Sequence, residues 1–392
     1  MFIIRREASR IILNLARRRT VITIIGPRGS GKTTLARMLF PRHRYVSLED
    51  PDVLEFARKR PGDFFRHYEG DIVIDEFRLA PELAGPMRAV MLSEKCPGRY
   101  ILITSYRQMK RPENAPRVKP PPQGYAAMVY LLPLSIRELV QLNVSFDRDE
   151  SICRGFMPGV FAPDADQKRV YRSYCIDYLK RSVRQSAELG DMSGFGRFMK
   201  FLAGRVGQIM NHRSFAEEAG VPVNTIYTWI SALEASFIIF RLPNYFDGFG
   251  RRLVNTPKFY FTDVGLAASL LGLDTPRRVF RDPQVGNLFE NMVIADALKG
   301  RYNRGRGANL YYFRSRNGLE IDLILSGMPG AFPVEIKAGA SFDASFARNI
   351  EMFRRLSKRI RSGCVVYSGD ERAKEGAVPY INFKDFGLVM DP

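Results

Sequence analysis

Residues 20–33 have the sequence TVITIIGPRGSGKT, and this stretch decides the fold of the N-terminal part of the chain. An apolar run rich in β-branched residues leads into a glycine-rich turn, and TTLARMLF (33–40) continues with helical character. The turn has the pattern G-x-x-x-x-G-K-T, in which backbone N–H groups surround phosphate oxygens at the start of a helix. Because a strand precedes it and a helix follows, the stretch predicts a phosphate-binding loop.

Each residue type in this loop has a predicted role in holding ATP and Mg²⁺. Glycines allow the backbone to curve tightly around the phosphates. The Lys32 ammonium reaches the β- and γ-phosphates, and the Thr33 hydroxyl is a ligand for Mg²⁺. The predicted nucleotide-binding residues are Gly26, Pro27, Arg28, Gly29, Ser30, Gly31, Lys32, Thr33, Thr34 and Ser105.

A second motif, DIVIDE at residues 71–76, has the form of a strand that ends in two acids. Asp75 is predicted to hold Mg²⁺, and Glu76 to orient or polarise the attacking water, so that Glu76 and Lys32 are the predicted catalytic residues. Two acids often end a strand on a solvated surface, but their position after a phosphate-binding loop favours a functional role. Ser105, or Thr104 beside it, is expected to contact the γ-phosphate or the water, with an ordinary strand-end residue as the alternative.

The segments around these motifs alternate between strand and helix. Strands are predicted at residues 20–26, 44–50, 71–76, 99–105 and 128–135. Helices are predicted at 5–19, 33–40 and 81–95, and within 52–68 from residue 52 until Pro61. Strands that alternate with helices predict a parallel sheet covered on both faces, as in P-loop NTPases. We predict an N-terminal α/β domain of this kind over residues 1–140, with a proline-rich loop at 107–124.

A central region over residues 141–283 is predicted to be mainly helical. Residues 213–242 have the pattern helix, turn, helix, strand, and residues 258–263 are expected to complete the wing of a winged helix. Its second helix carries Asn224 but no Lys or Arg, the side chains that most often read bases. We therefore expect this region to pack between domains, with Trp229 in the core, and nonspecific duplex contact through nearby arginines as the alternative.

A C-terminal domain over residues 284–392 is predicted to have the element order α-β-β-β-α-β, which is that of the restriction-endonuclease-like core. In LEIDLILS, Glu320 and Asp322 alternate and share one strand face. Pairing with the next strand would bring Asp322 beside Glu335 and Lys337, which predicts a catalytic group that uses a divalent metal to activate water. The predicted metal ligands are Asp322, Glu335 and Glu290, and ion pairs on a solvated face are the alternative.

Composition limits the class of protein and its partners. The chain has 392 residues and a net charge of +19, and most of the basic surplus lies in its first third. This charge suggests contact with a polyanion such as DNA, although a solvated basic surface would look the same. Four cysteines and three histidines, without metal-ligand spacing, argue against zinc and fit a reduced cytoplasm. The sequence shows neither a secretory signal nor an apolar run that spans a bilayer, so we expect no membrane partner.

Several motifs together resemble a prokaryotic family that joins an AAA-type ATPase domain to a C-terminal domain of unknown function. They are GPRGSGKTT (26–34), DIVIDE (71–76), YLLPLSIREL (130–139), YRSYCIDYLKRSVRQ (171–185), SFAEEAGVPVNTIYTWISALEASFIIFRL (214–242), KFYFTDVGLAASLLG (258–272), VGNLFENMV (285–293) and YFRSRNGLEIDLIL (312–325) with FPVEIK (332–337). The resemblance implies ATP binding and a restriction-endonuclease-like C-terminal fold. The chain departs from the family at Ser182, where an acid is common, and at Gly124-Tyr125, where an arginine is common. Arg181 and Arg184 remain arginine-finger candidates, or form a basic helix face.

Three functional hypotheses follow from these patterns. The first is an ATP-hydrolysing switch or motor of the AAA type that acts on DNA or on a protein partner, with a homo-oligomer as a possibility. The second is a metal-dependent DNA nuclease gated by ATP. The third is a nucleotide-dependent scaffold that binds DNA or protein without catalysis.

Overall fold

The computed structural model describes residues 4–93, 96–106, 124–141, 147–175, 192–245, 256–315, 318–328, 330–356, 360, 362–371 and 378–390. The chain divides into two compact units. Unit 1 contains the residues up to Pro133 with two short later segments, Ala235–Phe237 and Tyr302–Arg306, and unit 2 contains the remainder. The predicted division at 1–140, 141–283 and 284–392 stays a prediction. Ser182, Arg181, Arg184 and almost all of the 107–124 loop lie outside the described residues.

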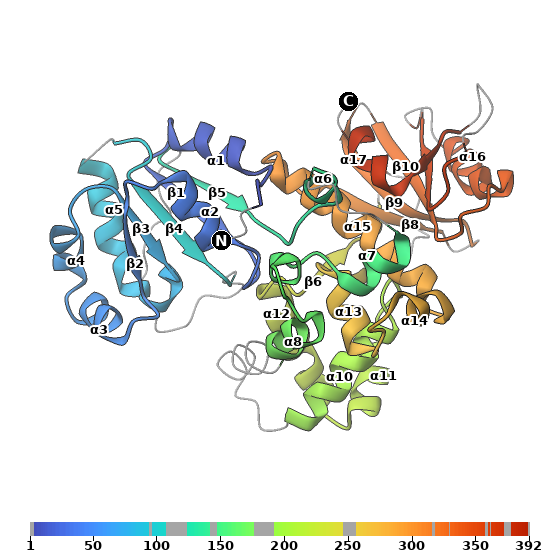
Figure 1. Ribbon diagram of the computed structural model, residues 1–392, viewed down its shortest axis with the longest axis horizontal. Helices are drawn as coiled ribbons and strands as arrows, with labels where there is room; N and C mark the ends of the chain where they lie inside the picture. Colours follow the sequence, from blue (N-terminus) through green and yellow to red (C-terminus); the bar gives the residue numbers. More distant parts are fainter. Residues whose placement is uncertain are drawn as a thin grey trace. The chain divides into compact units, whose positions relative to one another are not determined.

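Unit 1 is built around a five-stranded parallel sheet, as predicted (Figure 1). Its strands have the spatial order β2-β3-β4-β1-β5, and each neighbouring pair is parallel. The strands are β1 (Val21–Ile25), β2 (Arg44–Ser47), β3 (Ile72–Asp75), β4 (Tyr100–Thr104) and β5 (Ala126–Tyr130). Because all five strands point the same way, the loop after β1 and the ends of β3 and β4 meet at one edge of the sheet.

Helices cover both faces of this sheet, because its strands are apolar on both sides. They are α1 (Ser9–Ala16), α2 (Lys32–Leu39), α3 (Pro51–Lys59), α4 (Pro61–His67) and α5 (Ala84–Ser93), with 3₁₀ turns at Phe77–Leu79 and Pro81–Leu83. Ile22 and Ile24 pack with residues of α1 and α2 on one face. Val21 and Leu102 pack with residues of α3, α4 and α5 on the other. The two apolar cores hold the sheet edge that carries the phosphate-binding loop.

The structure corrects several predicted boundaries and confirms one predicted helix end. The helix predicted at 5–19 is Ser9–Ala16, and the strand predicted at 44–50 is Arg44–Ser47. The strand predicted at 128–135 is β5, Ala126–Tyr130, and it ends early because Pro133 lacks an N–H and Leu134 donates instead to the carbonyl of Phe156. The helix predicted from residue 52 ends before Pro61, as expected, since Arg60 leaves the helical conformation with φ −132°. A further helix, α4, begins at Pro61 and was not predicted. Prolines thus account for the end of α3 and for the early end of β5.

Unit 2 begins with helices, as predicted for the central region. They are α6 (Ile136–Val140), α7 (Arg148–Arg154), α8 (Gln167–Ser173), α10 (Met192–Gly204), α11 (His212–Ala219), α12 (Val223–Ala235), α13 (Val264–Leu270) and α14 (Pro276–Arg281), with a 3₁₀ turn at Pro158–Phe161. The helix pair α11 and α12 is followed by an antiparallel ribbon of β6 (Ile239–Leu242) and β7 (Lys258–Phe261). This is the element order predicted for a winged helix.

The C-terminal part of unit 2 contains a mixed five-stranded sheet with the order β12-β11-β10-β9-β8 (Figure 1). The elements are α15 (Val285–Asn303), β8 (Leu310–Arg314), β9 (Glu320–Met328), β10 (Gly330–Lys337), α16 (Arg348–Arg354), β11 (Cys364–Tyr367), β12 (Tyr380–Asn382) and α17 (Phe386–Val389), with 3₁₀ turns at Ala344–Ala347 and Phe383–Asp385. Strands β8, β9 and β10 are antiparallel neighbours, whereas β10, β11 and β12 are parallel. The predicted order α-β-β-β-α-β is present.

Among the described residues, none of the helices combines the length and the apolar character that crossing a membrane requires.

Candidate functional site

The loop between β1 and α2 has the backbone geometry of a phosphate-binding loop. Gly29 and Gly31 have φ values of 77° and 90°, which L side chains rarely adopt, and Gly31 is the N-cap of α2. Gly26 lies so close to the chain after β5 that an added Cβ would stand 2.0 Å from the carbonyl oxygen of Leu131. The first N–H groups of α2 therefore face an open loop that only glycines at these positions permit.

Lys32 is held inside this loop rather than in solvent. Its ammonium is buried and donates to the carbonyl oxygen of Pro27 at 2.7 Å. Burial lowers the pKa of Lys32 to about 8, while the negative charges of Glu76 and Asp75 oppose the shift. A triphosphate in the loop would give this poorly solvated ammonium a charged partner.

The end of β3 brings an oxygen-rich group to the start of α2. The Thr33 hydroxyl donates to Asp75 Oδ2 at 2.7 Å, and the Tyr45 hydroxyl donates to the same oxygen at 2.8 Å. Burial and these contacts with Asp75 raise the pKa of Tyr45 to about 12. A hydroxyl and a carboxylate are the oxygen ligands that Mg²⁺ prefers, and Mg²⁺ usually keeps waters at its other positions. The donors present therefore fit the predicted ion.

Glu76 follows with an unusual backbone. Its φ of 51° and ψ of 44° place it in the left-handed region, and its side chain is buried. The carboxylate accepts hydrogen bonds from the hydroxyl of Ser105 and, at 3.3 Å, from the Ser105 N–H. Arg78 pairs with it at 3.5 Å and lies over the ring of Tyr106. Of the two residues considered at the end of β4, the structure places Ser105 against Glu76.

The other predicted loop residues lie at the rim or behind it. Arg28 is exposed and pairs with Glu49 at 2.8 Å. Thr34 is exposed on α2, whereas Ser30 is buried. Thr104, the alternative to Ser105, donates to the carbonyl oxygen of Tyr106. These positions leave Lys32, Thr33, Asp75, Glu76 and Ser105 as one compact group.

A second polar group forms in unit 2, where β9 and β10 pair. Asp322 accepts a hydrogen bond from the Ile336 N–H at 2.8 Å and lies 3.8 Å from the Lys337 ammonium. Lys337 also donates to Glu335 Oε2 at 2.9 Å. The structure thus brings together Asp322, Glu335 and Lys337, the three residues that strand alternation singled out.

Glu335 is the most enclosed member of this group. Its side chain is 1% exposed, and Oε1 has no hydrogen-bond partner among the described residues. Burial and the charge of Asp322 raise the pKa of Glu335 to about 8, against the opposing influence of Lys337 and Asn349. This carboxylate lacks the full set of partners that an ionised, buried oxygen requires.

Glu290, on α15, approaches the same group but is bound to residues of the β6–β7 ribbon. Lys258 Nζ lies 3.3 Å from Glu290 Oε1 and 2.7 Å from Glu320 Oε1, and the Tyr260 hydroxyl donates to Glu290. Burial raises the pKa of Glu290 to about 7, while Lys258 opposes the rise. Although burial acts in the other direction, the charges of Glu290, Glu320 and Asp322 raise the pKa of Lys258. We call Glu290, Glu320, Asp322 and Glu335 the carboxylate cluster.

Each carboxylate of the carboxylate cluster lies within ion-pair distance of one of two lysines, Lys258 and Lys337. Over the described part of the chain, no group of three or more His, Cys, Asp or Glu side chains is arranged to hold a metal ion. The metal-ligand role expected for Asp322, Glu335 and Glu290 therefore stays a prediction.

Comparison with protein families divides the chain into three matched segments. Residues 18–140 match the AAA domain family, and this segment contains the loop, Asp75, Glu76 and Ser105. Residues 18–140 form an AAA-type ATPase domain. Residues 145–277 and 285–386 match two families described as domains of unknown function, DUF8612 and DUF4143.

Relatives of the whole chain are distant. It is 25% identical over 377 residues to uncharacterised proteins of Mycobacterium tuberculosis and Mycobacterium bovis, a match that covers 95% of this chain and 82% of each relative. The Walker-type ATPase of Pyrococcus abyssi is 13% identical with a TM-score of 0.41, over 67% of this chain and 94% of that one. The ORC1 protein of Aeropyrum pernix in complex with DNA is 13% identical with a TM-score of 0.30, over 69% and 92%. Structural similarity this low carries no inference about function.

Three residues of the AAA domain and its flank were not found by sequence reasoning. Arg6 donates to the carbonyl oxygens of Ser30 and Leu132 at 2.6 and 2.7 Å, and so ties the loop to the chain after β5. Tyr45 and Arg78 contact Asp75 and Glu76 directly. No short motif marks these three residues. The position of Arg78, two residues after DIVIDE, was the one signal that could have indicated a role at the site.

The second helix of the predicted winged helix, α12, lacks the Lys and Arg side chains that most often read bases. Trp229 is fully buried and packs edge-on against Phe195, as expected of a core residue. Asn224 is exposed at the start of α12, which has no Lys or Arg. The segment 246–255, between β6 and β7, lies outside the described residues.

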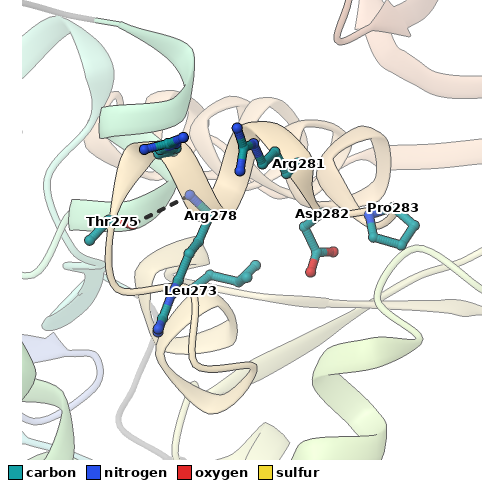
Figure 2. A pocket seen from close by; sticks show the side chains of 7 residues that line it. Leu273, Thr275, Arg278, Arg281, Asp282 and Pro283 are labelled. Carbon is teal, nitrogen blue, oxygen red and sulfur yellow. Dashed lines mark hydrogen bonds between the residues drawn. The ribbon is translucent and has the colours of Figure 1, made fainter.

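An arginine-rich pocket lies instead around α14 (Figure 2). Its volume is about 610 Å³, and its lining consists of Leu273, Thr275, Arg277, Arg278, Arg281, Asp282 and Pro283. Asp274 holds Arg278 at 2.9 Å, and Thr275 caps the helix by accepting from the Arg278 N–H. Three exposed guanidinium groups against one lining carboxylate make the pocket suited to anions.

Proposed function

We propose that the AAA-type domain binds ATP with Mg²⁺ at the loop of residues 26–33 and hydrolyses it. The observation that carries this proposal is the 2.7 Å contact between the Thr33 hydroxyl and Asp75, which are 42 positions apart in sequence. It lies at the start of α2, beside the buried Lys32, where helix geometry favours phosphate. Bound Mg²⁺ would supply positive charge to the phosphates at Thr33 and Asp75.

The remaining residues of the site divide the work of hydrolysis. When ATP binds, the Lys32 ammonium exchanges its hydrogen bond to the Pro27 carbonyl for the phosphate oxygens, and so gains a charged partner. The backbone N–H groups of the loop orient the phosphates, and Glu76 orients the attacking water and takes up its proton. Ser105 positions Glu76 by hydrogen bonding to its carboxylate at the end of β4.

ATP turnover and ATP binding, measured together, test this proposal. Lys32→Ala is expected to weaken ATP binding, whereas Glu76→Gln keeps binding and lowers turnover by about 100-fold or more. Lys59→Ala is the matched control, because Lys59 is exposed and pairs with Glu55 on the same helix, α3. Unchanged turnover in both site variants would remove the proposal.

Action on DNA is the partner hypothesis that the charge distribution favours. The chain carries a net charge of +19, and the pocket at α14 presents three arginines to solvent. Phosphate contacts supply most of the nonspecific affinity for DNA, and arginine is well suited to them. We infer that ATP turnover in the AAA domain serves an action on DNA, with α14 as one of the contact points.

Metal-dependent cleavage of DNA by a restriction-endonuclease-like fold in unit 2 is a second candidate function. Convergence of Asp322, Glu335 and Lys337, with a buried and unpartnered Glu335 oxygen, favours it. The residues present offer carboxylate oxygens to a divalent ion, which would activate water there. Lys337 would steady the attacking hydroxide.

Cleavage of supercoiled plasmid in the presence of Mn²⁺ and ATP tests this second function. Glu335→Ala and Lys337→Ala are expected to abolish cutting that the wild type performs. Glu351→Ala serves as a matched control, since Glu351 is exposed on α16. Equal cutting by wild type and both site variants would assign the activity to a contaminant.

A further inference from the structure

We infer that Lys258 is the resident cation of the carboxylate cluster, and that a divalent metal ion binds the cluster only by displacing the Lys258 ammonium. The inference rests on the second candidate function in one respect: both assume that these carboxylates bind a divalent metal ion. It adds to that function a residue from the β6–β7 ribbon, outside the C-terminal sheet.

Three contacts hold the side chain of Lys258 in place. Its side chain is 6% exposed, and its ammonium lies 2.7 Å from Glu320 and 3.3 Å from Glu290. The centroid of the Tyr312 ring lies 5.4 Å from Nζ, so that cation–π attraction adds to the two ion pairs. A buried ammonium with three such partners is held in place rather than free to sample solvent.

Tyr260, on the same strand as Lys258, also contacts the carboxylate cluster. Lys258 and Tyr260 are two positions apart on β7 and share one face, and the Tyr260 hydroxyl donates to Glu290. Strand β7 pairs with β6, and Asn244, just after β6, forms a bridge with Tyr312 on β8. The ribbon is therefore attached to the sheet that carries the rest of the cluster.

Charge balance explains why a metal ion and Lys258 compete. Lys258 uses Glu290 and Glu320, and Lys337 uses Asp322 and Glu335, so all four carboxylates have a lysine within ion-pair distance. A divalent ion needs several of the same oxygens at 2–2.6 Å. It cannot share them with an ammonium that stands at hydrogen-bond distance from two of them. Glu335 Oε1, which is buried and has no hydrogen-bond partner among the described residues, cannot hold the ion alone.

Titration of the full-length protein with Mn²⁺, without nucleotide, tests the inference. All variants carry Asp75→Asn, so that binding at the ATP site does not contribute and failure of the ATPase proposal has no bearing on the result. Lys258→Met is expected to raise the affinity for Mn²⁺ at least about tenfold, because a unit positive charge leaves the cluster. Arg314→Met is the matched control, since Arg314 lies 3.6 Å from Glu320 but is half-exposed and not inserted among the carboxylates.

A folded Lys258→Met protein with unchanged Mn²⁺ affinity overturns the inference, and so does an equal gain in Arg314→Met. If Lys258→Met does not fold, Lys258→Gln, which removes the same charge but keeps a hydrogen-bond donor for Glu290 and Glu320, replaces it and is held to the same tenfold gain. Lysine acetylation followed by mass spectrometry gives a second readout in the wild-type protein. Saturating Mn²⁺ is expected to speed acetylation of Lys258 and leave that of Lys59 unchanged, whereas continued protection of Lys258 in the metal-bound protein overturns displacement.

Discussion

Glu76 combines a left-handed backbone with a buried, hydrogen-bonded carboxylate. For a residue with a Cβ, this conformation costs about 1–2 kcal/mol. The strain persists because Ser105 and Arg78 hold the side chain at the end of β4. Strained residues that are held by their surroundings are concentrated at functional sites. At this position the conformation aims the carboxylate at the edge of the sheet where the phosphate-binding loop lies.

The strain at Glu76 predicts an inverted order of stability for two substitutions. Glu76→Ala and Glu76→Gly both remove the carboxylate, but only alanine keeps the Cβ that opposes a positive φ. Glu76→Gly is therefore expected to have the larger free energy of unfolding by about 1 kcal/mol, the reverse of the order in ordinary backbone. Denaturant unfolding of the two variants measures it. A more stable Glu76→Ala would show that the backbone relaxes.

The lowered pKa of Lys32 predicts uptake of protons when ATP binds. With a pKa of about 8, Lys32 is half-protonated at pH 8 in the free protein, and phosphate charges raise its pKa on binding. Uptake of about half a proton is expected at pH 8 and almost none at pH 6.5, where Lys32 is already charged. Calorimetry in buffers of different ionisation enthalpy measures it. Lys32→Arg stays charged and should abolish the uptake, and uptake that persists in it would implicate another group.

At the scale of helices and strands, the ATP site forms where the β1–α2 loop packs against the chain that follows β5. Gly26 makes this approach possible, and Arg6 bonds to both partners across it. In unit 2, pairing of β9 with β10 performs the same task for Asp322 and Glu335. Strand ends and turns thus position polar residues that the apolar cores of the sheets could not accommodate.

A matched pair of glycine substitutions tests the close packing of the β1–α2 loop. Gly26→Ala would place its Cβ 2.0 Å from the Leu131 carbonyl oxygen, whereas nothing lies within 4 Å of a Cβ at Gly62 in α4. Gly26→Ala is expected to lower the free energy of unfolding by about 2 kcal/mol or more and to weaken ATP binding. Gly62→Ala should be neutral or stabilising by up to about 1 kcal/mol. Thermal melts with and without ATP compare them, and equal behaviour would contradict the close approach.

The whole molecule carries a strong positive charge whose basic surplus is concentrated in the first third of the sequence. Charge of this size attracts polyanions over distances set by salt, whatever the fold. What the fold adds is the arrangement of Arg277, Arg278 and Arg281 around one pocket on α14. Position, rather than number of charges, is what distinguishes a binding surface from a solvated one.

The salt dependence of DNA binding distinguishes a specific binding surface at α14 from a general effect of net charge. Arg277→Ala with Arg281→Ala is expected to weaken binding of any DNA sequence and to reduce the slope of log affinity against log salt by about 2. Lys200→Ala with Arg213→Ala removes the same charge from exposed positions on α10 and α11 and serves as control. Fluorescence anisotropy with a labelled duplex at several salt concentrations measures both. Equal slopes would assign binding to net charge alone.

Most of the ATP site could be predicted because its signals are local. Lys32 and Thr33 lie in one motif, and the acids of DIVIDE end a recognisable strand. Residues that reach the ATP site from elsewhere in unit 1, such as Arg6 and Tyr45, escaped prediction, and so did Lys258 of the carboxylate cluster in unit 2. For Lys258, the one available signal was its alternation with Tyr260 in an otherwise apolar strand, which indicates a polar strand face.

By itself, the sequence determined the phosphate-binding loop, the parallel sheet, the order of the C-terminal elements and the polar alternation along β9 and β10. These follow from spacing and periodicity over a few residues, where covalent geometry limits the choices. Only the tertiary structure decided that Ser105 rather than Thr104 holds Glu76, and that Lys258 enters the carboxylate cluster. Those contacts join residues 29 or more positions apart, and chain spacing leaves such pairings open until the apolar cores pack.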